Sequence, residues 1–118
     1  MPGKKTHNGM VRAMQAGEEI RKRAQNAETG ERGVMYETRH EVTSAGYAIT
    51  LRYWGTVIAL FQPALDRLEI HTGGFNSVTT IALMNAIALG FGLGVSFGRE
   101  RGEAVIWFDG RLYEFPHA

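Results

Sequence analysis

Three hydroxyl side chains behind a double glycine are the strongest candidates for chemistry in this chain. Ser77, Thr79 and Thr80 follow Gly73 and Gly74, and a long apolar segment comes directly after them. A hydroxyl oxygen at the start of a helix accepts a hydrogen bond from a backbone N–H group that has no partner within the helix. The same N–H groups can bind an anion. The cluster therefore predicts a helix cap, and an anion site is the alternative interpretation.

The histidines and cysteines give no sign of a metal site or of nucleophilic catalysis. The sequence contains no cysteine, which excludes disulfides, a thiolate nucleophile and cysteine-bound metals. The histidines have neither a partner at helical spacing nor a carboxylate at the spacing of metal ligands. They are His7, His40, His71 and His117. We therefore expect no metal and no cofactor.

Two other patterns resemble functional motifs but have the wrong setting. The glycines of the run 90–94 are spaced like part of a dinucleotide-binding fingerprint, which must follow a strand and open a helix. Here the run ends a predicted helix and opens a strand. Glu100 and Glu103 flank two arginines in a predicted turn, where solvent would prevent the difference in pKa that acid–base catalysis requires. The sequence therefore predicts a protein that is not an enzyme.

Length and composition describe a single folded unit. A chain of 118 residues with 44% hydrophobic and 21% charged residues can form a self-supporting core. Its longest apolar run, 81–91, is interrupted by Asn85 and Gly90 and is too short to cross a bilayer. We expect a soluble, cytoplasmic protein.

Charge is distributed unevenly along the chain. Residues 1–33 carry seven cations and four acids, whereas residues 34–118 carry six arginines, no lysine and eight acids. The first segment has several glycines and no aromatic residue, so it cannot form a core of its own. We expect a basic arm at 1–33, either solvated or with a helix through 11–27. A single folded domain at 34–118 would follow it.

Alternating patterns predict strands in this folded part. Four segments are typical of consecutive antiparallel strands, namely 34–42, 47–53, 56–61 and 67–71. Trp54-Gly55 is one expected turn, and a helix is predicted over 79–90. A strand at 93–97 and a hairpin about Asp109-Gly110 follow, because this dipeptide is typical of a type I′ turn. The expected fold is α+β, an antiparallel β-meander with one helix packed on the sheet and a C-terminal β-hairpin.

The segment that begins at the double glycine resembles a pattern found in small, largely uncharacterised bacteriophage proteins. That pattern is Gly-Gly-aromatic-x-Thr-x-Thr-Thr followed by Asn. The chain matches it with Gly73-Gly74-Phe75, Ser77, Thr79-Thr80 and Asn85. A hairpin rich in tryptophan or tyrosine follows in those proteins, as Trp107 and Tyr113 do here. The chain differs at Ile81-Ala82-Leu83, where the family often has lysine or arginine.

The resemblance implies a phage accessory protein that binds and inhibits a host protein or ribonucleoprotein complex in the host cytoplasm. An anti-CRISPR or similar counter-defence role is the most specific form of this expectation. Rigid aromatic side chains near turns would anchor such a partner. The expected partner-binding residues are Trp54, Phe75, Ser77, Thr79, Thr80 and Tyr113.

Two alternatives belong to other classes of function. In a nucleic-acid-binding module, the consecutive cations Arg21, Lys22 and Arg23 would contact phosphates. Bases would then stack on tyrosines of an exposed sheet face, namely Tyr36, Tyr47 or Tyr53. In a small virion or assembly component, an exposed strand edge would join copies into a homo-oligomer. The net charge of +1 disfavours strong binding to a polyanion.

Overall fold

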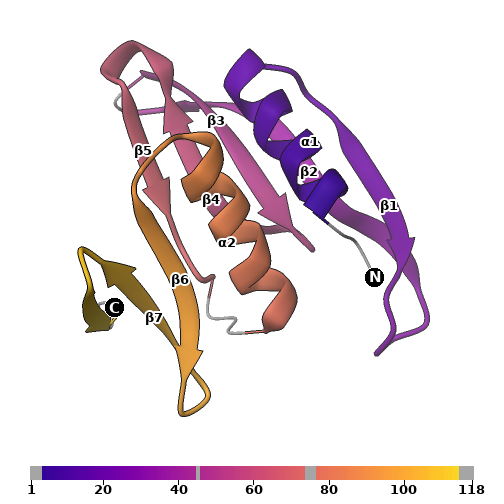
Figure 1. Ribbon diagram of the computed structural model, residues 1–118. Coiled ribbons are helices and arrows are strands. Elements are labelled where there is room, and N and C mark those ends of the chain that lie inside the picture. The colour runs from indigo at the N-terminus through magenta and orange to yellow at the C-terminus, as the bar shows by residue number, and fades with distance from the viewer. Residues whose placement is uncertain (1–3, 45, 74–76, 115–118) are drawn as a thin grey trace.

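A computed structural model describes residues 4–44, 46–73 and 77–114 of the chain. This part of the chain contains two α-helices, one 3₁₀ helix and eight strands (Figure 1). In chain order they are α1 (Lys4–Ala16), β1 (Arg21–Gln25), β2 (Arg32–Thr43), β3 (Gly46–Tyr53), β4 (Thr56–Gln62), η1 (Pro63–Leu65), β5 (Arg67–Ile70), α2 (Val78–Gly90), β6 (Val95–Glu100), β7 (Glu103–Phe108) and β8 (Arg111–Glu114). The expected α+β class is confirmed.

The larger sheet is a meander in which every strand pairs with the next strand along the chain. Its order is β1-β2-β3-β4-β5, and all four pairs are antiparallel. Trp54 and Gly55 connect β3 to β4 with φ angles of 48° and 82°. Positive φ at both positions is what a type I′ hairpin requires. The expected four-stranded meander is confirmed, and β1 extends it by a fifth strand.

Both helices cover the same face of this sheet (Figure 1). The helix α2 lies between α1 and β6, so it is surrounded by protein on most sides. Its buried residues are Thr80, Ile81, Leu83, Met84, Ala86, Ile87 and Ala88. They share one core with Tyr36, Leu51 and Ala59 of the sheet. The predicted helix at 79–90 is confirmed.

The N-terminal segment contains a helix, which was one of the two expected alternatives, but it packs on the body and has other bounds than expected. The helix α1 ends at Ala16, before Gly17 with a φ of 72°, so the bounds predicted at 11–27 are wrong. Its buried residues are His7, Met10, Val11, Ala13 and Met14. They recur every three or four positions and form one apolar stripe against α2 and the sheet. Residues 4–33 therefore belong to the same folded body as the rest, and no boundary lies at residue 33.

The strands β6, β7 and β8 form a separate antiparallel sheet beside α2, which we call the C-terminal sheet (Figure 1). Its two turns are Arg101-Gly102, with φ of 53° and 80°, and Asp109-Gly110, with φ of 51° and 74°. The hairpin predicted at Asp109-Gly110 is confirmed. Phe97 and Ile106 pack toward the core, so one face of this sheet is covered by the body and the other is not.

Candidate interaction surface

The hydroxyl cluster at the start of α2 forms a helix cap. The Ser77 Oγ accepts a hydrogen bond from the backbone N–H of Thr80 at 3.2 Å. The same oxygen lies 2.9 Å from the Thr80 Oγ1. Thr80 is fully buried, whereas Thr79 is half-buried. The predicted cap is therefore confirmed for Ser77 and Thr80, whose hydroxyls bond to each other.

The structure does not bring the other predicted partner-binding residues together. Trp54 lies at the turn between β3 and β4, where its ring covers Gly33. A Cβ atom placed on Gly33 would lie only 3.3 Å from that ring. Tyr113 lies on β8, and Arg21, Lys22 and Arg23 form the first half of β1. Phe75 is outside the described residues.

Two of the tyrosines expected to stack on bases, Tyr36 and Tyr53, pack beneath the helices, whereas Tyr47 is 44% exposed beside His40. Tyr36 is 1% exposed, and its hydroxyl lies 2.8 Å from the Nε2 of His7 on α1. Burial lowers the pKa of His7 and raises the pKa of Tyr36. The Tyr53 ring packs on Tyr36, with centroids 5.3 Å apart. The stacking role proposed for Tyr36 is therefore wrong, because α1 covers the face on which it stands.

A group of exposed apolar side chains lies on the C-terminal sheet. Trp107, Phe108, Leu112 and Tyr113 are between 43% and 48% exposed, and they stand on the neighbouring strands β7 and β8. The register places Trp107 and Leu112 on the outer face of the sheet, and Phe108 and Tyr113 on the inner face with Ile106. We call Trp107 and Leu112 the apolar surface. Trp107 is opposite Leu112 in the β7–β8 register, so the two side chains share the outer face of the sheet. Large apolar side chains gathered in solvent often mark a binding site.

A hollow of about 480 Å³ adjoins Leu112 on this outer face. Its apolar part is Val105 and Leu112, and its charged rim is Glu100, Arg101 and Glu103. An apolar side chain of a partner could fill the apolar part, and a neighbouring cation of that partner could meet the two carboxylates.

Asn85 fixes the C-terminal sheet to the body of the protein. Its side chain donates to the carbonyl oxygen of Phe97 at 2.9 Å and accepts from the backbone N–H of Phe97 at 2.7 Å. Phe97 is in β6 and Asn85 is in the middle of α2. The amide therefore pairs with the edge of β6 much as another strand would. It holds the apolar surface on a rigid support.

Sequence reasoning missed this surface as a set. It did not single out Leu112, it read Trp107 only as part of a motif, and Tyr113, which it did single out, stands on the opposite face. The available signal was the run Val105-Ile106-Trp107-Phe108, which puts apolar side chains on both faces of one strand. A strand covered on one face needs apolar residues only at alternate positions.

The described residues contain no group of three or more His, Asp or Glu side chains that could hold a metal ion. None of the helices in residues 4–44, 46–73 and 77–114 is long and apolar enough to cross a membrane.

Comparison with protein-family models, with curated proteins and with solved structures finds no significant match to this chain. The resemblance to bacteriophage proteins stays a prediction from the motif around Thr79 and Thr80.

Proposed function

We propose that the protein is a non-enzymatic, stoichiometric binder of another protein and that the apolar surface is its binding face. The observation that carries this proposal is the exposure of Trp107 and Leu112 side by side on the outer face of two adjacent strands. Tryptophan and tyrosine are enriched among the residues that dominate binding energy at protein interfaces.

The size of the apolar surface fits the centre of an interface. Large side chains of this kind present about 150–250 Å² each, so the two of them at somewhat under half exposure offer roughly 170 Å². One side of a standard interface buries about 800 Å². The apolar surface would thus supply about a fifth of that area as its centre, and the hollow with its charged rim would supply part of the rest.

The charges around the hollow favour a particular partner. Glu100 and Glu103 lie beside Val105 and Leu112, and these two carboxylates outnumber Arg101 on the rim. This arrangement favours a partner segment in which an apolar side chain stands next to a lysine or arginine. The resemblance of the Thr79-Thr80 motif to phage proteins adds a host protein or ribonucleoprotein complex as the proposed partner. Inhibition of that partner, in the manner of an anti-CRISPR protein, is the proposed consequence.

The titratable groups with shifted pKa values support a role without catalysis. His7 and Tyr36 share a hydrogen bond beneath α1, where both are almost completely buried. The hydrogen bond from Arg52 lowers the pKa of Glu41, which stabilises the charged form of a carboxylate in an ion pair. In both cases the shift has a structural explanation.

Site-specific photocrosslinking tests this proposal. The protein would be produced in the organism that carries its gene, with p-benzoylphenylalanine in place of Leu112. A matched version would carry the same group in place of Leu65, an exposed leucine of η1 on another part of the protein. We expect one host protein to be crosslinked from position 112 and not from position 65.

Three results would contradict the proposal. Equal crosslinking from both positions would mean that contact is nonspecific, and the absence of any product from position 112 would mean that the surface has no partner. A product that contains only a second copy of the chain would support the homo-oligomer alternative instead.

A further inference from the structure

We propose that the protein has a second interaction surface, on the side opposite the apolar surface, which binds the phosphate backbone of a nucleic-acid duplex. Six exposed cations make up this basic surface, from α1, β1 and the start of β2. They are Lys4, Lys5, Arg12, Lys22, Arg23 and Arg32. None of the six forms an ion pair within the described residues, whereas Arg21, Arg39, Arg52 and Arg67 each do.

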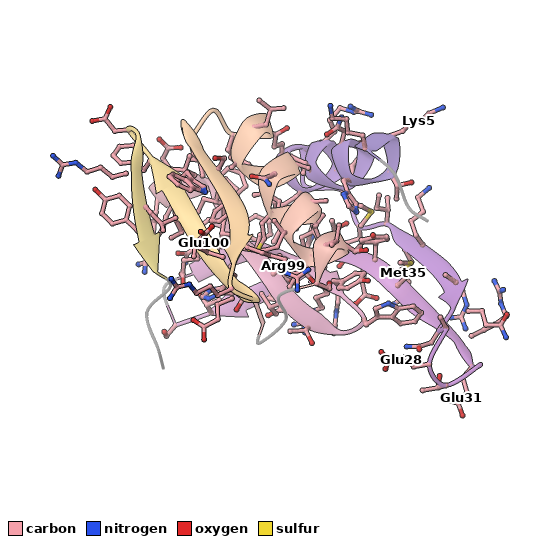
Figure 2. All side chains as sticks on the ribbon, turned by 60° about the horizontal axis from the view of Figure 1, so that its bottom comes forward. Lys5, Glu28, Glu31, Met35, Arg99 and Glu100 are labelled. Atoms are coloured by element: carbon pink, nitrogen blue, oxygen red, sulfur yellow. The ribbon has the colours of Figure 1, made fainter. Side chains whose placement is uncertain are left out.

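The fold places these cations along one side of the molecule. Figures 1 and 2 both show α1 beside the β1–β2 hairpin, with the C-terminal sheet at the other end of the protein. Lys5 points away from the body in Figure 2. Arg12 follows Lys5 by seven residues, so the two side chains share a helix face about 10 Å apart along the axis. That separation is close to the width of about 12 Å that the major groove of B-DNA presents between its phosphate backbones.

The acidic residues of the same segment neutralise only part of this surface. Glu19 keeps its negative charge while it accepts a hydrogen bond from the backbone N–H of His40 at 2.8 Å. Glu28 and Glu31 lie at the far tip of the β1–β2 hairpin (Figure 2). Glu18 is the remaining acid before residue 34. The net charge of +1 for the whole chain therefore conceals a local excess of positive charge.

Protection of a sheet edge explains only part of this pattern. Edge strands often carry cations and bulges that prevent pairing with another chain. β1 is an edge strand with a bulge between Lys22 and Arg23, so these two cations fit that explanation. It does not account for Lys5 and Arg12, which stand on a helix. A polyanionic partner accounts for both sets.

The surroundings favour a duplex over a single strand. Proteins that bind single strands usually stack bases on exposed aromatic rings. Tyr36 is buried under α1, and Tyr53 packs against it. Tyr47 is exposed, but its ring packs edge-on against His40, and its strand β3 carries none of the six cations. The basic surface is thus suited to phosphate contacts that do not depend on base sequence.

Salt dependence gives the expected magnitude. Each phosphate that is neutralised contributes about 0.9 to the slope of log K against log salt concentration. Four or five contacts predict a slope of about −4, so affinity would fall on the order of 250-fold between 50 and 200 mM salt.

Fluorescence anisotropy with a 20-base-pair DNA duplex, and with one of its strands alone, tests this inference. We expect the wild-type protein to bind the duplex more tightly than the single strand, with the slope given above. The double variant K5Q/R12Q, and independently K22Q/R23Q, should each reduce the slope by about 1.8, since each removes two contacts. The matched control R99Q/R111Q removes the same charge from the C-terminal sheet and should leave the slope unchanged.

The inference would be overturned by any of three results. These are no duplex binding at 50 mM salt with protein at 100 µM, tighter binding to the single strand, or an equal effect of the control variant. None of these results depends on crosslinking at Leu112, so the two proposals fail separately.

Discussion

The two hydrogen bonds between Asn85 and the backbone of Phe97 allow a sharp test of how the C-terminal sheet is held. The substitution Asn85→Ala removes both bonds, which measure 2.9 and 2.7 Å, without adding any atom to the core. Phe97 is 8% exposed, so water can replace the amide only with difficulty. Each bond contributes about 1–1.5 kcal/mol in such a setting. We expect the free energy of unfolding to fall by about 2–3 kcal/mol.

Thermal unfolding followed by circular dichroism measures this change. For a chain of this length, 1 kcal/mol corresponds to about 4 °C in Tm, so Tm should fall by about 8–12 °C. Hydrogen exchange of the Phe97 amide should accelerate in the same variant. The matched control is Asn8→Ala, because Asn8 lies on α1 in the same groove between the helices and is also only partly exposed. Both substitutions gain the same helix propensity.

The reasoning would be refuted if Asn85→Ala and Asn8→Ala changed Tm by the same amount. It would also be refuted if the Phe97 amide exchanged at the wild-type rate, because the side chain of Asn85 would then not protect β6.

Three further predictions concern packing, pH and capping. Gly90→Ala should destabilise the protein by about 1–3 kcal/mol in urea unfolding, because the new Cβ would lie 2.6 Å from the Val11 side chain. Gly9→Ala meets nothing within 4 Å and should stabilise the protein by about 0.5–1 kcal/mol, so destabilisation there would contradict this account. Burial lowers the pKa of His7 below its usual 6.5, so unfolding takes up a proton between the two values and stability should fall as the pH drops below 6.5. Unfolding titrations of His7→Gln should lack this dependence, and an unchanged profile would assign it elsewhere. Ser77→Ala should lower the free energy of unfolding by about 1 kcal/mol through loss of the cap, and an unchanged urea midpoint would exclude that role.

The parts of the fold that could be predicted have local causes. Asp109-Gly110 forms a turn because aspartate and glycine both accept positive φ between two strands. At Trp54-Gly55 the glycine is the local signal, and the pairing of β3 with β4 holds the bulky Trp54 at positive φ. The strand β1 has no such signal, since Arg21-Lys22-Arg23 is a run of charges. It is extended because its backbone pairs with the edge of β2, which is a property of the assembled sheet.

The same distinction applies to the candidate surfaces. Ser77 and Thr80 lie three residues apart, so their cap could be predicted from spacing alone. The bond between Asn85 and Phe97 depends on β6 returning alongside α2, and the burial of Tyr36 depends on α1 crossing the sheet. No local pattern in the sequence predicts that β6 lies alongside α2 or that α1 crosses the sheet. The exposed and covered faces could therefore not be assigned from the sequence.

The contact between the two helices has a consequence for synthesis of the protein. The side chain of Gln15 on α1 donates to the carbonyl oxygen of Gly90 at 2.8 Å, across 75 positions of the chain. The strands between them are joined mostly by short hairpins and can pair soon after they emerge from the ribosome. α1 emerges first, but α2 is among the last of its neighbours to be synthesised. At ordinary rates of translation α2 follows α1 after about 4–15 s. During that interval Met10 and Met14 have no α2 to cover them, so the nascent chain presents an apolar helix that a chaperone can bind.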